Sequence, residues 1–245
     1  MTTKTLHEEV FPMRINKYLA HAGFSTRRGA DTLINEKRVF VNGKPAVMGQ
    51  KVTLTDKVEI KDFDTSHYEY ILYYKPRGVI THSPENDEVD IETRIKRDHS
   101  IVGLFPIGRL DKDSEGLIIL TNDGRITERV LSPEQGHERE YEVTVDKRVT
   151  QTFLNRLEKG VVIERYHTKP AKAASLPGNE FGFTLILTEG KKHQVRRMCA
   201  ACGYQVTSLK RTAVLDFKLR SLKSGEFYRL KQKEALYFQK TLGLH

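Results

Sequence analysis

Long apolar runs are missing from this sequence of 245 residues. No stretch approaches the roughly 20 apolar residues that a membrane-spanning helix needs, so no such helix is predicted. The first ten residues are polar and acidic, and they lack the basic-then-apolar pattern of a secretory signal. We therefore interpret residues 1–12 as a flexible N-terminal tail.

Cysteine is scarce: only Cys199 and Cys202 occur, spaced as C-x-x-C. A structural zinc site needs four ligands, and the sequence has no second C-x-x-C or paired histidine motif. A redox C-x-x-C usually opens a helix, whereas this pair falls late in an expected helix. We interpret the pair as two buried or half-buried thiols, with a redox or metal role as the alternative. Because two thiols do not favour secretion, a reducing cytoplasm is the expected compartment.

Positive charge, in contrast, is in excess, with a formal net charge of +9 and a pI of about 9.4. Such an excess favours a polyanionic partner, because bound phosphates release counterions. A generally basic surface and an acidic membrane face are the alternatives. Three basic pairs sharpen the first interpretation, although each alone is also typical of a solvated face: Arg27-Arg28, Lys191-Lys192 and Arg196-Arg197.

Residues 13–61 predict a compact αα-β unit. Apolar residues recur with helical spacing over residues 15–22, and Gly23 stands where a glycine ends a helix. Ser25 or Thr26 is expected to cap a second helix. Short strands should follow, since an Asn-Gly turn signal lies between apolar residues and Pro45 suits an edge strand. The strands are expected at residues 39–41 and 58–60.

This first unit resembles the S4 RNA-binding domain. The resemblance rests on RINKYL at 14–19, STRR at 25–28 and VFVNGK at 39–44, in that order. Such a basic surface binds RNA phosphates by shape rather than by base sequence. A basic helical pair without a ligand is the alternative. The residues expected to contact RNA are Arg14, Lys17, Arg27, Arg28, Lys37 and Lys44, with Arg38 beside them.

Residues 62–67 are polar and aperiodic and are the predicted linker, which would tether RNA near a larger domain at 68–245. In that domain strand-like and helical segments mix without strict β-α-β repetition. This mixture favours an α+β fold around a mixed, largely antiparallel sheet with flanking helices. Strands are expected at 70–74, 79–80, 117–120, 141–145 and 181–187, and helices at 125–131, 149–159 and 195–201.

The stretch GRLDKDSEGL at 108–117 is the strongest candidate for chemistry. Asp111 stands between two cations, Arg109 and Lys112, in a loop that leads into an apolar strand. Flanking positive charge favours the ionised carboxylate, which then acts as a nucleophile or base. From spacing alone, a surface ion pair remains the alternative.

Four motifs together resemble pseudouridine synthases of the RsuA/RluB/RluE/RluF type. They are KPRGV at 75–79, GRLD with its continuation to residue 124, EYEV at 140–143 and GKKHQVRRM at 190–198. Tyr74 departs from the asparagine that usually precedes the first motif. The detailed wording is closest to the RluF-type branch, which acts on large-subunit ribosomal RNA. The resemblance implies site-specific isomerisation of uridine to pseudouridine, without a cofactor or metal.

The resemblance also implies residue roles. Asp111 is the expected catalytic nucleophile, Arg196 its ion-pair partner and Tyr141 the residue that stacks on the target base. A phosphate contact for Arg196 and a plain core position for Tyr141 are the alternatives. Further RNA contacts are expected from Arg109, Leu110, Lys112, Gly190, Lys191, Lys192, His193 and Arg197.

Three alternatives stay open for the function. The same chemistry could act on small-subunit ribosomal RNA or on a tRNA anticodon loop. A chain of this kind could also be a non-catalytic S4-type ribosome assembly factor. A monomer is the expected state.

Overall fold

The computed structural model describes residues 11–22, 24–25, 27–61, 68–82 and 88–244. Most of the predicted tail, the whole predicted linker at 62–67, Gly23 and Thr26 lie outside these residues. The chain divides into two compact units. The first comprises Met1–Tyr68 with Asn122–Glu128, and the second comprises Glu69–Thr121 with Arg129–His245. The domain boundaries expected from the sequence stay a prediction.

The first unit contains the two predicted helices and short strands. They are β1 (Met13–Arg14), α1 (Ile15–His21), α2 (Arg27–Asn35), β2 (Val39–Val41), β3 (Lys44–Pro45), β4 (Lys51–Val52) and β5 (Val58–Ile60). Ile15, Leu19 and Ala30 are fully buried in its core. Asn42 and Gly43 both have positive φ, which a tight hairpin turn between β2 and β3 requires. In the three-stranded sheet β3-β2-β5, the strand β3 with its proline lies at the edge, as predicted.

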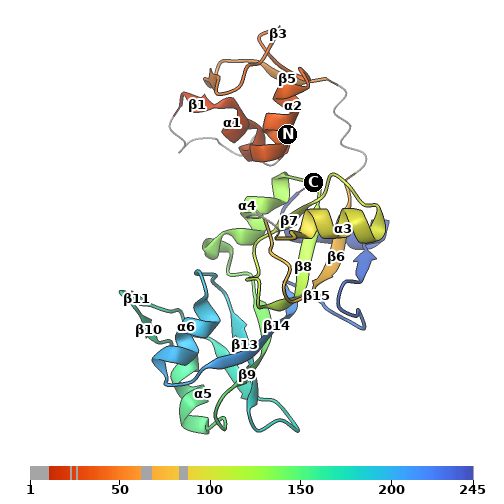
Figure 1. The fold of residues 1–245 in the computed structure, drawn as a ribbon. Coiled ribbons are helices and arrows are strands. Elements are labelled where there is room, and N and C mark those ends of the chain that lie inside the picture. The colour runs from red at the N-terminus through yellow and green to blue at the C-terminus, as the bar shows by residue number, and fades with distance from the viewer. Residues whose placement is uncertain (1–10, 23, 26, 62–67, 83–87, 245) are drawn as a thin grey trace. The chain divides into compact units, whose positions relative to one another are not determined.

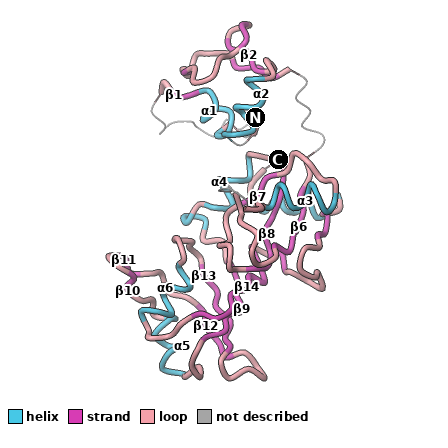
Figure 2. The backbone as a smooth tube through the Cα atoms, in the orientation of Figure 1, coloured by secondary structure: helices cyan, strands magenta, loops and turns pink. Residues whose placement is uncertain are grey.

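The second unit is built on a sheet to which nine strands belong among the described residues. The order is β12-β13-β9-β14-β8-β6-β16, with β15 on β14 and β7 on β8 (Figures 1 and 2). All pairings are antiparallel except the short one between β14 and β8. The predicted α+β class with a mixed, largely antiparallel sheet is confirmed. The strands are β6 (Tyr70–Lys75), β7 (Phe105–Ile107), β8 (Glu115–Thr121), β9 (Arg139–Val145), β12 (Lys172–Ser175), β13 (Gly182–Leu187), β14 (Val206–Val214), β15 (Phe217–Lys218) and β16 (Phe227–Arg229).

Two apolar cores hold this sheet to its helices. In one, α5 and α6 pack with β9 and β13 through residues such as Leu157, Met198 and Leu185. In the other, α3 packs with β6 and β8 through Ile95 and Ile118. The helices of the unit are α3 (Ile91–His99), α4 (Arg125–Leu131, shared with the first unit), α5 (Gln151–Glu158), α6 (Gln194–Ala201) and α7 (Gln232–Thr241), and the hairpin β10 (Val162–Ile163) and β11 (Tyr166–His167) stands apart from the sheet.

Most strongly patterned segments adopt the expected structure, with ends that shift by one to two residues. The strand predicted at 79–80 is wrong: only an isolated bridge joins Ile80 to Asp90. The interpretation of the two cysteines as free thiols is confirmed, with Cys199 buried and Cys202 half-buried. Burial raises the pKa of Cys199 to about 12. Within the described ranges, no helix is long and apolar enough to cross a bilayer.

Candidate active site

The loop between β7 and β8 carries Asp111 and is held along its length. The Thr81 hydroxyl accepts from the Leu110 N–H at 3.0 Å and donates to the Leu110 carbonyl at 2.7 Å. The Gly78 N–H donates to the Lys112 carbonyl at 2.8 Å, and the Ser114 N–H donates to the Asp111 carbonyl at 3.0 Å. A carboxylate on a loop with so many backbone anchors keeps a fixed position.

The carboxylate of Asp111 faces His193. Its Oδ1 lies 3.4 Å from Nε2 of His193, and the two side chains are 35 % and 48 % exposed. His193 precedes α6 with φ 53° and ψ 29°, in the left-handed region that few non-glycine residues adopt. His193, which the sequence analysis places among the RNA contacts, therefore lies next to the expected catalytic carboxylate of Asp111.

The ion pair predicted between Asp111 and Arg196 is not formed by these two described residues. Arg196 instead donates to the Asp113 carbonyl at 3.3 Å, to the Ser114 hydroxyl at 3.2 Å and to the Val206 carbonyl at 3.3 Å. The guanidinium of Arg196, which α6 carries, thus holds the end of the Asp111 loop, two residues after Asp111. The catalytic role of Arg196 itself stays a prediction.

Tyr141 lies on β9 and is 9 % exposed, directly opposite Arg211 on β14. Arg211, which sequence reasoning missed, is 4 % exposed. Its Nε donates to the Leu117 carbonyl at 2.7 Å, and its Nη1 donates to the Arg109 carbonyl at 3.2 Å. Burial lowers the pKa of Arg211, while the neighbouring phenol of Tyr141 and, more weakly, the negative charge of Asp111 oppose that shift.

A second buried cation is Lys75 of the KPRGV stretch, which has no exposed surface. Its Nζ donates to the carbonyls of Pro76 and Val79 at 2.8 and 2.6 Å. Burial lowers the pKa of Lys75 to about 8, and the negative charge of Asp111 opposes that shift most strongly. Before it, Tyr74 donates its hydroxyl to Glu115 at 2.8 Å in the place where asparagine is usual.

The remaining expected contacts of the second unit differ in accessibility. Leu110 is 7 % exposed, and its expected contact with RNA stays a prediction. Lys112 is exposed and pairs with Glu88 at 2.8 Å, and Arg197 pairs with Glu164 at 2.8 Å. The exposed residues are Arg109, Gly190, Lys191 and Lys192, and the Nζ of Lys191 lies 4.6 Å from the ring centre of Tyr166.

In the first unit the expected RNA contacts lie mostly on the surface. Lys17 is half-buried, and the side chain of Arg28 lies outside the described part of the chain. The exposed members are Arg14, Arg27, Lys37 and Lys44.

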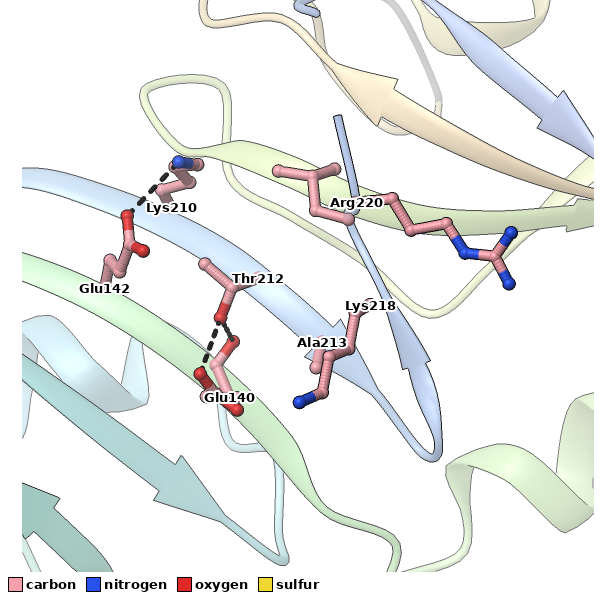
Figure 3. Close-up of a pocket in the computed structure, with 8 residues that line it drawn as sticks. Glu140, Glu142, Lys210, Thr212, Ala213, Lys218 and Arg220 are labelled. Carbon is pink, nitrogen blue, oxygen red and sulfur yellow. Dashed lines mark hydrogen bonds and ion pairs between the residues drawn. The ribbon is translucent and has the colours of Figure 1, made fainter. Parts of the chain in front are cut away.

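A separate polar pocket opens beside β9 and β14 (Figure 3). Lys210 pairs there with Glu142 at 3.2 Å, and the Thr212 hydroxyl donates to Glu140 at 3.2 Å. Strand alternation directs Glu140 and Glu142 away from the face that carries Tyr141. Neither Asp111 nor the histidine that faces it lines this pocket, so the pocket is not the candidate active site.

The fold and the site together define a class of protein. A firmly anchored, partly exposed carboxylate faces a histidine, and the loop that carries it is bound by a buried arginine that stands opposite a strand tyrosine. The other unit of the chain carries exposed basic side chains. This combination is typical of an enzyme that acts on RNA. Residues 69–201 match the family described as RNA pseudouridylate synthase, and residues 13–58 match the S4 domain.

Relatives and a solved structure agree. The chain is 38 % identical to "Dual-specificity RNA pseudouridine synthase RluF" of Salmonella typhi, over 91 % of this chain and 77 % of the relative. It is 37 % identical to "Ribosomal large subunit pseudouridine synthase B" of Bacillus subtilis, over 87 % and 90 %. A crystal structure of a pseudouridylate synthase is 29 % identical with a TM-score of 0.67, over 94 % and 99 %. The chain belongs to the RNA pseudouridylate synthase family and carries an S4 domain. It is an isomerase that acts on RNA.

Proposed function

We propose that this chain converts a uridine of large-subunit ribosomal RNA into pseudouridine, with Asp111 as the catalytic carboxylate. The observation that carries the proposal is the cluster at Asp111, a partly exposed carboxylate that faces a histidine, on an anchored loop whose Arg109 carbonyl is bound by the buried Arg211. The relative named as a ribosomal large subunit enzyme supports the choice of RNA.

The proposed reaction is an internal rearrangement of one nucleotide. The N1–C1′ bond breaks, the freed base turns, and C5 bonds to C1′. The C5 hydrogen leaves as a proton and N1 gains one, so that no atoms and no electrons are gained or lost. Neither a redox group nor an acceptor is needed, and the proposal includes no cofactor.

Each group has a task in this reaction. Asp111 reacts at C1′ or C6, or removes a sugar proton. Tyr141 presents its ring to the uracil, and its hydroxyl is the proposed relay for the C5 proton: the oxygen takes that proton as its own phenol proton passes to solvent. Exposed Arg109 holds the target nucleotide out of the stack, because a stacked uridine hides its reacting atoms.

A second candidate keeps the chemistry and adds a second RNA, either small-subunit ribosomal RNA or a tRNA anticodon loop. The word "dual-specificity" in the name of a 38 % identical relative favours it. In both cases the S4 surface would bring folded RNA to the catalytic unit. The monomeric state and the cytoplasmic location stay predictions.

The test is pseudouridine mapping in ribosomal RNA and tRNA from cells with and without the protein, and in the same RNAs treated with the purified protein. Modification of a large-subunit uridine is the expected result. Modification of small-subunit ribosomal RNA or tRNA alone would mean that this RNA, and not large-subunit ribosomal RNA, is the substrate. If no uridine is modified in any of these RNAs, the proposal is refuted.

Asp111→Asn should lower the rate on the order of 10⁴-fold or more, because the variant has no reacting carboxylate. Its RNA affinity should stay within about threefold of the wild type. Asp113→Asn is the matched control, since Asp113 is an exposed carboxylate in the same turn, and it should retain the wild-type rate. Full activity of Asp111→Asn would end the catalytic assignment.

A further inference from the structure

We propose that Arg211 is the positioning residue that fixes Tyr141 relative to the Asp111 loop. This inference rests on the proposed function and extends it to a residue outside the four sequence motifs. It starts from a plain anomaly: Arg211 is almost fully buried, yet no carboxylate of the described residues lies within ion-pair distance of it. Unpaired buried arginines are rare, so its partners need an account.

The partners of Arg211 come from three parts of the candidate site. One edge of the guanidinium binds the Leu117 carbonyl of β8 and another binds the Arg109 carbonyl of the Asp111 loop, while Tyr141 lies directly opposite Arg211 on β9. The guanidinium is planar and rigid, so it fixes the mutual distances of the groups that it joins. The tyrosine and the loop are thereby linked through one side chain.

Tyr141 and Arg211 are placed together by the sheet. They stand directly opposite each other on the antiparallel strands β9 and β14, and both are almost fully buried. Directly opposed side chains leave the same face of a sheet and lie close enough to interact. A guanidinium has only donors, so its interaction with the phenol is directed at the phenol oxygen of Tyr141.

The backbone of Arg211 is also fixed. Arg211 pairs with Gly116 of β8, which has φ +111°, and a Cβ on this glycine would lie 2.3 Å from the Arg211 carbonyl oxygen. Only glycine permits this approach of β8 and β14. The backbone of Arg211 is therefore held in place by the pairing with β8, and its guanidinium binds carbonyls that also have fixed positions.

Charge completes the argument. The interaction of Arg211 with the negative charge of Asp111 offsets part of the penalty for burying the cation. The sequence predicts Arg196 as the cation that pairs with Asp111, but Arg196 binds the far end of the loop. Arg211 is therefore the buried cation that we assign to this part of the site.

The test compares Arg211→Met, Arg211→Lys, Tyr141→Phe and the double variant Arg211→Met/Tyr141→Phe in single-turnover assays with saturating enzyme and RNA that contains the target uridine. Arg139→Met is the matched control, because Arg139 is also buried and donates to the carbonyls of Val130 and His137. All rates are expressed per folded molecule, and RNA affinity is measured in parallel.

We expect Arg211→Met to lower the rate on the order of 100-fold, as removal of one preorganised donor does. RNA affinity should stay within about threefold, so the effect is on kcat and not on binding. Arg211→Lys should recover only part of the rate, since it keeps the charge but not the planar fork of donors. The double variant should be no slower than the slower single variant, because Arg211 acts through Tyr141.

Several results would overturn the inference. One is an Arg211→Met rate within about threefold of the wild type. Another is a rate reduction in the double variant that equals the product of the reductions in the two single variants. A third is a reduction in Arg139→Met as large as that in Arg211→Met. If Arg211→Met does not fold, Arg211→Lys decides the question, and a wild-type rate in that variant refutes the role.

A second measurement does not depend on the reaction. In protein labelled with fluorotyrosine, the fluorine NMR signal that Tyr141→Phe removes should shift in Arg211→Lys and stay unchanged in Arg139→Met. An unchanged signal in Arg211→Lys refutes the contact even if the wild type modifies no RNA. If the signal shifts in Arg211→Lys but the wild type modifies no RNA, the proposed function is refuted and the contact between Arg211 and Tyr141 is not.

Discussion

At the scale of single residues, Lys75 is a buried amine whose charge changes within an accessible pH range. Its pKa is lowered to about 8 from an ordinary value of 10.5. Between these two pH values the unfolded chain binds a proton that the folded chain has released. The free energy of unfolding therefore gains a term that rises with pH, by at most about 1.4 kcal/mol per pH unit. Below pH 8 the penalty for burying the charge is fully present.

We predict that Lys75→Met lacks this rise. Because the carbonyls of Pro76 and Val79 then have no donor from this side chain, the variant should be less stable than the wild type near neutral pH. The difference should widen between about pH 8 and 10 as the wild type gains stability. Urea unfolding across this range measures both, and Lys233→Met, at an exposed lysine of α7, is the control. A pH dependence that Lys75→Met shares with the wild type would contradict the prediction.

Residues of the candidate site differ in how far the sequence predicts them. Asp111 and its neighbours form one contiguous motif, and Tyr141 stands in an alternating strand, so local pattern is sufficient to single them out. Arg211 has no local signal, because its importance arises from the strand that pairs beside it. His193 and Arg196 were recognised as site residues, but which of them faces the carboxylate depends on how α6 begins.

At the scale of elements, the close approach of β8 and β14 positions the site. We predict that Gly116→Ala lowers the free energy of unfolding by about 2 kcal/mol or more, because its methyl group must displace backbone of Arg211. The rate of catalysis per folded molecule should also fall, since Arg211 moves. Urea unfolding and single-turnover assays measure the two effects.

Gly178→Ala is the matched control for this prediction. Gly178 also has positive φ, at +77°, but a Cβ there would meet nothing within 4 Å. Its free energy of unfolding should fall by only about 1 kcal/mol, from backbone strain, and its catalytic rate should be unchanged. Equal destabilisation in Gly116→Ala and Gly178→Ala would mean that the close approach of β8 and β14 does not require glycine at position 116.

The same scale shows why some elements escape sequence reasoning. Segments such as β9 and α4 have a clear period and clear ends, and they form where expected. The helix α3 buries only Ile91 and Ile95 among its charged residues, so its apolar period is too weak to detect. In β14 the exposed and half-buried residues of the first half conceal the strand, and pairing with β9 and β8 stabilises it.

At the scale of the whole molecule, the net charge of +9 predicts that RNA binding depends on salt, and the S4 surface should carry much of that dependence. We predict that the triple variant Arg14→Gln, Lys17→Gln, Arg27→Gln binds RNA more weakly and with a shallower plot of log affinity against log salt concentration. Each phosphate that the variant no longer neutralises should lower that slope by roughly 0.7–0.9. The control neutralises three exposed lysines elsewhere in the same unit, Lys51, Lys57 and Lys61, and so matches the change in net charge. If both variants lower the slope equally, the dependence comes from net charge, and the first helices of the S4 domain do not bind RNA specifically.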